Sequence, residues 1–219
     1  MKVRLSNQSL LGIISIATFF LLILNLGCAS TSQTTNTTQA QSGSEALVEH
    51  EPETLYENVP IVNRLVDIEN NKSGFKINIW TVRNTDKYRI GEDVVYLIRT
   101  NRDSYVTLFN IGSSGNIYQI YPNQYQKVSF CRAGETVRIP ASNADFAFQL
   151  QGPTGFETVK AFATLKDVPL LSPNLSQKVG PIHQATVPEK VLAREIITQL
   201  NNLPINYWAE DEYEIYVGY

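Results

Sequence analysis

The sequence predicts an all-β protein, an immunoglobulin-like antiparallel β-sandwich with one C-terminal helix. Three observations lead to this prediction. Apolar and polar residues alternate with a period of two, turn residues separate the alternating segments at short intervals, and one late segment has helical spacing. Many short strands separated in this way favour a sandwich or a barrel over alternating strands and helices.

The first residues of the chain have the pattern of an export signal. Lys2 and Arg4 give a basic start, and the apolar run Leu10–Leu24 is short for a membrane span of about 20 residues. The run ends at Asn25-Leu26-Gly27-Cys28. Residues 1–27 therefore resemble a bacterial lipoprotein signal peptide, which implies cleavage before Cys28 and lipidation of its thiol.

Two positions depart from the lipoprotein pattern. Asn25 stands where Leu is usual, and Leu26 is bulkier than the small residue most common at its position. Ordinary signal cleavage and an uncleaved anchor therefore remain alternatives. Ala29 and Ser30, after the cysteine, include no Asp of the kind that retains lipoproteins at the inner membrane. The resemblance thus implies a lipid-anchored protein of the bacterial cell envelope, at the outer membrane rather than the inner one.

The composition divides the rest of the chain into four parts. We expect residues 28–54 to be a disordered tether. Apart from Glu45, residues 29–45 are all small or polar, and such residues cannot bury enough surface to offset the entropy of ordering. A lead-in segment covers 55–74, the β-sandwich domain covers 75–166, and a loop, a helix and a C-terminal strand in 167–219 pack on that domain.

The strands follow from alternation in the sequence. Phe75–Val82 (FKINIWTV) shows it most clearly, as in a half-buried strand. The remaining expected strands are Val94–Thr100, Tyr105–Ile111, Asn116–Tyr121, Thr136–Ile139, Phe146–Gln151 and Phe156–Leu165.

Short turns between these segments predict how the strands pair. Asn101–Ser104 and Gly112–Gly115 join three consecutive strands, so we expect an antiparallel meander. Gly152–Gly155 predicts a hairpin between the last two strands. In the second of these, Val159, Ala161, Ala163 and Leu165 share a face of mostly small residues. That face predicts close approach to a neighbouring layer.

One helix is expected near the C-terminus. Thr186 and Glu189 fit a capping box, and Leu192, Ile196 and Leu200 recur every four residues until Pro204 ends the pattern. Before it, Asp167–Pro181 contains three prolines and is expected to be an irregular loop. After it, the alternation of Glu212–Val217 predicts an edge strand.

The charge excludes one class of partner. The 219 residues carry 18 basic and 21 acidic side chains, a net charge of −3, which becomes −5 without Lys2 and Arg4. A mildly acidic protein lacks the basic footprint of nucleic-acid binding. It also lacks a polybasic patch for anionic lipid, so a lipid anchor would provide the membrane attachment.

Catalytic and metal-binding patterns are scarce. The only histidines are His50 and His183, too few for a site of several imidazoles, and we expect no cofactor. A hydrolase would have to use His183, yet no Gly-x-Ser-x-Gly motif accompanies it. Cys131 would have no disulfide partner if Cys28 is lipidated, and we expect it to be a small buried residue rather than a reactive thiol.

Tyrosines gather in one part of the chain. Tyr118, Tyr121 and Tyr125 surround Pro122-Asn123 and are possible binding residues. Exposed tyrosines stack on sugar rings or anchor a protein partner. Packing in the core or across strands is the alternative explanation, because tyrosine also favours strands.

Five short motifs occur in order through the middle of the chain. They are Tyr88–Val94, Thr100–Leu108, Gly115–Ile117, Ile120–Asn123 and Ala133–Thr136. This order resembles the bacterial domain of unknown function 4384 (DUF4384) family over roughly Phe75–Leu165. The resemblance implies a small β-sandwich that accompanies other activities in exported or multidomain bacterial proteins. It implies no catalytic residues.

These observations predict a non-catalytic, lipid-anchored envelope protein that acts as a protein-interaction or accessory module. Its expected partners are the membrane, through the lipid, and another envelope protein. A lipoprotein that binds cell-wall or surface glycan through Tyr118–Tyr125 is the alternative, and a hydrolase using His183 is the third possibility.

Overall fold

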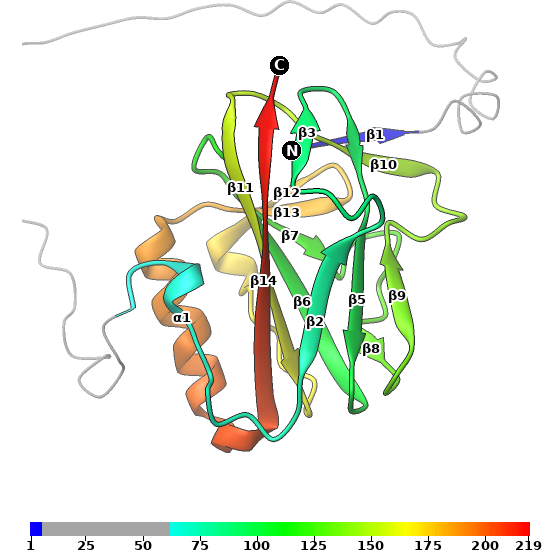
Figure 1. The fold of residues 1–219 in the computed structure, drawn as a ribbon. Helices are drawn as coiled ribbons and strands as arrows, with labels where there is room; N and C mark the ends of the chain where they lie inside the picture. The colour runs from blue at the N-terminus through cyan, green and yellow to red at the C-terminus, as the bar shows by residue number, and fades with distance from the viewer. Residues whose placement is uncertain (6–61) are drawn as a thin grey trace, which may run out of the picture. The chain divides into compact units, whose positions relative to one another are not determined.

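The structure, a computed structural model, describes residues 1–5 and 62–219. These residues belong to one compact unit. They form an all-β sandwich with one α-helix, α1 (Glu189–Asn201), near the C-terminus (Figure 1). The predicted fold class is therefore confirmed.

Most strands belong to one large sheet. Its neighbouring strands follow the order β12-β13-β7-β6-β11-β14-β3, and β8 also pairs with β6. The pairs are antiparallel except that β3 runs parallel to β14. The bounds are β3 Lys87–Arg89, β6 Ser104–Ile111, β7 Ile117–Tyr121, β8 Phe130–Cys131, β11 Gly155–Thr164, β12 Ser176–Val179, β13 Ile182–Ala185 and β14 Trp208–Gly218.

Two smaller sheets complete the strand set of the described residues. The small sheet has the order β2-β5-β9 and the edge sheet has the order β1-β10-β4, both antiparallel. Their bounds are β1 Lys2–Leu5, β2 Ile77–Thr81, β4 Asp93–Val94, β5 Tyr96–Thr100, β9 Thr136–Ile139 and β10 Phe146–Gln149. Short 3-10 helices lie at η3 Leu65–Asp67, η4 Pro173–Leu175 and η5 Ile205–Tyr207.

The large sheet separates two hydrophobic cores. The first core joins its inner face to the two smaller sheets and includes Ile98 of β5, Phe148 of β10 and Leu108 of β6. The second core joins its outer face to α1 and includes Leu192 and Ile196. Figure 1 shows α1 and the small sheet on opposite sides of the large sheet. The helix therefore packs on the sandwich.

Strand β11 contributes to both cores. Val159, Ala161 and Ala163 lie in the first core, and Phe162, on the opposite face, lies in the second. The small face predicted for this strand therefore lies between the two layers of the sandwich. Phe162 meets the ring of Phe109 edge to face, with their centroids 6.2 Å apart.

A lysine is buried on the helix side of β11. Lys160 is 1% exposed, and its Nζ lies 2.6 Å from Oε2 of Glu210 and 3.3 Å from Oε2 of Glu212. Both carboxylates come from β14, which pairs with β11 along its whole length. The ion pairs supply the partner that a buried ammonium group requires.

Two expected strand pairings are wrong. Strands β5 and β6 belong to different sheets, so Asn101–Ser104 crosses between layers and does not continue a meander. Strands β10 and β11 also belong to different sheets, so Gly152–Gly155 does not close a hairpin. The β6–β7 hairpin does form around Gly112–Gly115. Alternation placed the strands well, but it carries no information about which sheet a strand joins.

The C-terminal part also differs from expectation. The loop expected over Asp167–Pro181 contains β12, which forms a hairpin with β13. Strand β14 begins earlier than Glu212 and lies between β11 and β3, so it is not an edge strand. The capping box does not form, because Glu189 Oε1 instead accepts a bond of 2.9 Å from the Leu65 N–H. Pro188 occupies the N-cap position.

Several sequence-based predictions fall outside the described residues. Cys28, the tether 28–54 and the start of the lead-in segment 55–74 are among them. Residues 2–5, which the sequence assigned to the signal peptide, form β1 against β10. Among the described residues, no helix combines the length and the apolar character needed to cross a bilayer.

We expect Ala161→Leu to lower the free energy of unfolding by about 1–3 kcal/mol, because extra methylenes at a closely packed position force neighbours to move. Ala161 is fully buried between the two layers. The exposed Glu214 on β14 gives the control, and Glu214→Leu should change stability by no more than about 0.5 kcal/mol. Urea denaturation measures both, and equal stability of the two variants would contradict the close packing.

Candidate functional site: a basic and aromatic cleft

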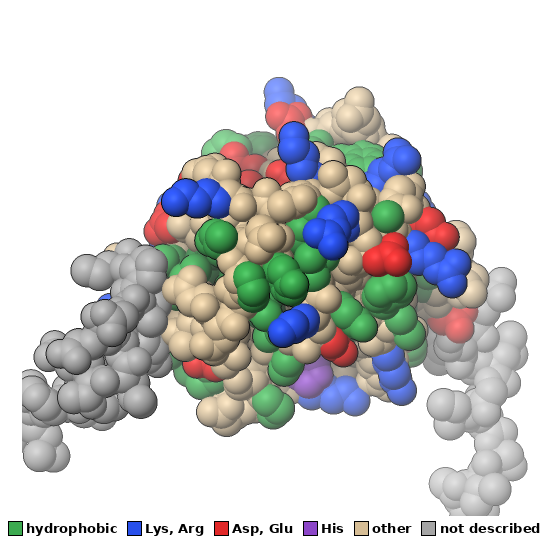
Figure 2. Space-filling view, turned by 90° about the horizontal axis from the view of Figure 1, so that it is seen from below, with side chains coloured by type: hydrophobic (Ala, Val, Ile, Leu, Met, Phe, Trp, Pro, Cys, Tyr) green, Lys and Arg blue, Asp and Glu red, His purple; other side chains and the backbone are tan. Residues whose placement is uncertain are grey.

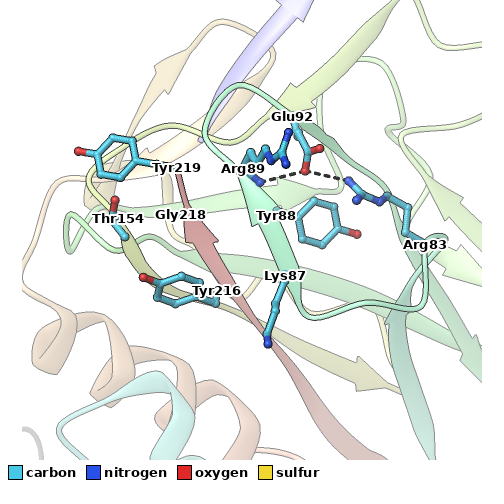
Figure 3. Close-up of a pocket in the computed structure, with 9 residues that line it drawn as sticks. All are labelled: Arg83, Lys87, Tyr88, Arg89, Glu92, Thr154, Tyr216, Gly218 and Tyr219. Atoms are coloured by element: carbon cyan, nitrogen blue, oxygen red, sulfur yellow. Dashed lines mark hydrogen bonds and ion pairs between the residues drawn. The ribbon is translucent and has the colours of Figure 1, made fainter.

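A cleft of about 650 Å³ lies where β3 meets the end of β14. Figure 3 shows the side chains around it, which come from the turn after β2, from β3 and the turn that follows, and from the ends of β11 and β14. Its lining residues are Arg83, Lys87, Tyr88, Arg89, Glu92, Thr154, Tyr216, Gly218 and Tyr219.

The alternation of β3 sets the orientation of its basic side chains. Tyr88 is 4% exposed and belongs to the first core, whereas its neighbours Lys87 and Arg89 are exposed. Parallel pairing aligns these three residues with Tyr216, Val217 and Gly218 of β14. The burial of Tyr88 therefore holds two cations on the solvent side of the strand.

Glu92 holds Arg83, the third cation of the cleft, in place. Its Oε2 accepts bonds of 2.9 Å from the Arg89 backbone N–H and 2.8 Å from Nη1 of Arg83, drawn as dashed lines in Figure 3. The backbone bond, followed by Arg83, lowers the pKa of Glu92 below its ordinary value. Gly91 makes the tight turn before it with φ +90, a conformation that favours glycine.

Arg83 also stacks on an aromatic ring. Its guanidinium carbon lies 4.7 Å from the centroid of Tyr88, a cation–π contact. The side chain is therefore held from two directions, by Glu92 and by the ring. Burial is the main cause that raises the pKa of the Tyr88 hydroxyl, so this group is neutral at physiological pH.

Exposed aromatic side chains form the other wall of the cleft. Tyr216 is 39% exposed and meets the ring of Phe156, itself 61% exposed, edge to face at 5.3 Å. A Cβ at Gly218 would stand 2.9 Å from Cε1 of Tyr216, so glycine leaves room for this ring. Tyr219 also lines the cleft.

The cleft combines the groups that bind an anion beside an apolar or aromatic group. Its lining side chains include three cations and one carboxylate, in a protein whose net charge is −3. The carboxylate of Glu92 is already paired with Arg83. Lys87 and Arg89 are thus the cations best placed to contact a negatively charged ligand.

The three tyrosines predicted as binding residues do not form an exposed row. Tyr121 is 2% exposed, and its hydroxyl donates a bond of 2.6 Å to the carbonyl of Val128. Tyr118 is partly buried against the first core. Tyr125 is 49% exposed and stacks on Phe146 with centroids 4.8 Å apart. Of the three, Tyr125 presents the most accessible ring.

His183 lies exposed on β13 and lines a separate depression of about 330 Å³. Lys127, Lys178 and neutral polar residues share the lining, which includes no carboxylate. A triad would require an acidic group to orient the imidazole.

Cys131 is buried, as its sequence context predicted. Burial raises the pKa of its thiol to about 11, so the reactive thiolate is scarce at neutral pH. Among the residues that the structure describes, no three His, Cys, Asp or Glu side chains gather in a way that would hold a metal ion.

Apolar side chains are scattered over the face shown in Figure 2, where they are interspersed with basic and acidic ones. Such mixing is normal for a protein surface.

Sequence reasoning missed this cleft because its residues come from distant segments. The chain as a whole is mildly acidic, so its composition gave no indication of a local group formed by Arg83, Lys87 and Arg89. Tyr216 lies far from them in sequence. The alternating basic residues in Lys87-Tyr88-Arg89 were the one local signal. Only the parallel pairing of β3 with β14 brings the two segments together.

The fold is a β-sandwich domain that carries a basic and aromatic cleft where β3 meets β14. Residues 87–167 match the family model described as Domain of unknown function (DUF4384). The match begins at β3 and ends just beyond β11, so β2, α1 and β14 lie outside it. No curated protein has significant similarity to the chain.

We expect Arg83→Gln to raise the pKa of Glu92 and yet leave it below its ordinary value. The variant removes the Arg83 contacts, while the Arg89 backbone bond, the larger cause, remains. An NMR titration of the side-chain carboxyl carbons measures this pKa. Lys178→Gln, at the separate depression, is the control and should leave it unchanged. An unshifted pKa in Arg83→Gln would contradict the geometry described.

Proposed function

We propose that the chain is a non-catalytic, lipid-anchored protein of the bacterial cell envelope that binds an acidic segment of another envelope protein. The lipid would be attached at Cys28, after removal of residues 1–27. The cleft at β3 and β14 would be the binding site. The observation that carries this proposal is the placement of Lys87 and Arg89 beside the exposed ring of Tyr216.

The chemistry of the cleft supports a protein ligand. A carboxylate of the partner would pair with Arg89, and an adjacent aromatic or apolar side chain would pack on Tyr216. Arginine and tyrosine are frequent energetic anchors of protein interfaces. Arg83 is held by Glu92 and Tyr88, so this wall of the cleft would lose little side-chain freedom on binding.

The tether would determine where the domain meets its partner. If about 25 residues after Cys28 behave as a flexible coil, their average reach is roughly 25–30 Å. The domain would then stay close to the membrane surface. We propose the outer membrane, because Ala29 and Ser30 include no Asp of the kind that retains lipoproteins at the inner membrane. Two or more acyl chains make such attachment stable, whereas one chain is marginal.

Glycan binding is the alternative function that we propose. Tyr121 is buried and its hydroxyl is engaged, so Tyr125 on Phe146 would be the main stacking platform. One ring gives less specificity than the cleft, which combines cations with aromatic groups. We therefore rank the acidic protein ligand first.

The anchor is tested by mass spectrometry of the mature amino terminus. We expect a chain that begins at Cys28 and carries the mass of its acyl groups, whereas Cys28→Ala should keep residues 1–27. Cys131→Ala is the matched control and should be processed as the unmodified chain is. A mature chain that starts at Ala29 or beyond, or one that still carries Met1, would contradict the lipid anchor.

The cleft is tested by photo-crosslinking in cells, with a photoreactive phenylalanine analogue in place of Tyr216. We expect a defined crosslinked envelope protein, identified by mass spectrometry, and at least a roughly tenfold loss of it in Lys87→Glu/Arg89→Glu through charge repulsion. Lys127→Glu/Lys178→Glu, at the separate depression, changes the net charge by the same amount and should retain the crosslink. The proposed site is wrong if the double variant crosslinks normally, or if the control loses the product equally.

A further inference from the structure

The depression beside His183 gathers basic side chains from two separate parts of the chain. Lys178 on β12 and His183 on β13 are direct partners in their antiparallel hairpin, and His183 is also the partner of Gln119 on β7. Residues paired in this way stand side by side on one face of a sheet, with their Cβ atoms about 4.5–5.5 Å apart. Lys127, from the loop after β7, completes the basic lining. Two lysines and one histidine therefore border the same small volume.

Hydrogen bonds hold the loop that carries Lys127 against the hairpin. The Gln124 N–H donates a bond of 2.9 Å to the carbonyl of Pro181, in the turn between β12 and β13. Nε2 of Gln119 donates a bond of 3.0 Å to the carbonyl of Pro122, at the start of the loop. The loop and the hairpin thus form one continuous rim. A site that is formed in advance loses little conformational freedom when a ligand binds.

The basic side chains of this rim lack acidic partners. Among the described residues, none that lines the depression is acidic, and Lys127, Lys178 and His183 take part in no ion pair. All three side chains are exposed. The cleft at β3 and β14 differs, because there a carboxylate neutralises one of the cations. Like charges on directly opposite residues of neighbouring strands are unfavourable, so an anion in the depression would relieve their repulsion.

The number and type of donors favour a phosphate group over a carboxylate. A phosphate monoester carries about −1.5 to −2 charges near neutral pH and has three strong acceptor oxygens, enough to contact three basic side chains together. Lysine is a frequent phosphate ligand. The Gln119 amide has a second N–H hydrogen that its bond to Pro122 does not use. The volume of about 330 Å³ lies at the small end of ligand sites and would hold the phosphate with a short attached group.

We infer that this depression binds a phosphate monoester, with Lys127, Lys178 and His183 around the phosphate oxygens. A small soluble ester and a lipid headgroup that ends in a phosphate present the same chemistry to these side chains. The site is separate from the cleft at β3 and β14. The inference depends neither on that cleft nor on lipidation of Cys28.

The test observes the imidazole of His183 directly by NMR. The full chain, carrying isotope-labelled histidine, is purified in a zwitterionic detergent and titrated with glycerol phosphate at constant pH and ionic strength. His50 is the other histidine of the sequence, so His183→Gln assigns both signals. We expect saturable shifts of the His183 signals and unchanged His50 signals. Phosphate bound at the cleft would not produce this pattern, because the readout is local.

Lysine variants determine whether the shifts report binding at this site. Lys127→Gln/Lys178→Gln should weaken binding roughly tenfold or more, because both ammonium groups are lost. Lys72→Gln/Lys166→Gln changes the net charge equally at exposed positions elsewhere and should bind as the unmodified chain does. Lys127→Arg/Lys178→Arg keeps the charges and should retain binding. Circular dichroism checks that each variant is folded.

The same signals distinguish the two sources of phosphate. If the ligand is a lipid headgroup, detergent micelles that contain phosphatidic acid should shift the His183 signals at a much lower phosphate concentration than glycerol phosphate does. Similar concentrations for the two probes indicate a soluble ester. The inference is overturned by the absence of saturable shifts with both probes, by equal shifts with sodium chloride, or by undiminished binding in Lys127→Gln/Lys178→Gln.

Discussion

Burial of both faces of β11 is the constraint on which the rest of the structure depends. Its inner face needs small side chains, because Ala161 and Ala163 lie between the two layers of the sandwich. Its outer face needs a helix to cover Phe162, and α1 provides one. The charge of Lys160 on that outer face requires carboxylates from β14, so β14 must pair with β11 along its length. One strand thus explains the layers, the helix and the long final strand.

The start of β11 divides its side chains between the surface and the interior. Phe156 points outward and meets Tyr216 at the wall of the cleft, while the next residue, Glu157, points into the sandwich. Alternation along a strand makes this division inevitable. The same stretch of chain therefore contributes to the candidate site and to the buried face of the large sheet.

Local pattern predicted the elements better than their arrangement. A period of two located β6, β9 and β11 almost to the residue, because half-buried strands must alternate. It could not reveal that β5 and β6 join different sheets, since that depends on packing between distant segments. The capping box failed for a similar reason, because Glu189 bonds to Leu65, which is far away in sequence. Likewise, Tyr121 and Tyr125 are close in sequence, yet the first is buried in the core and the second is exposed.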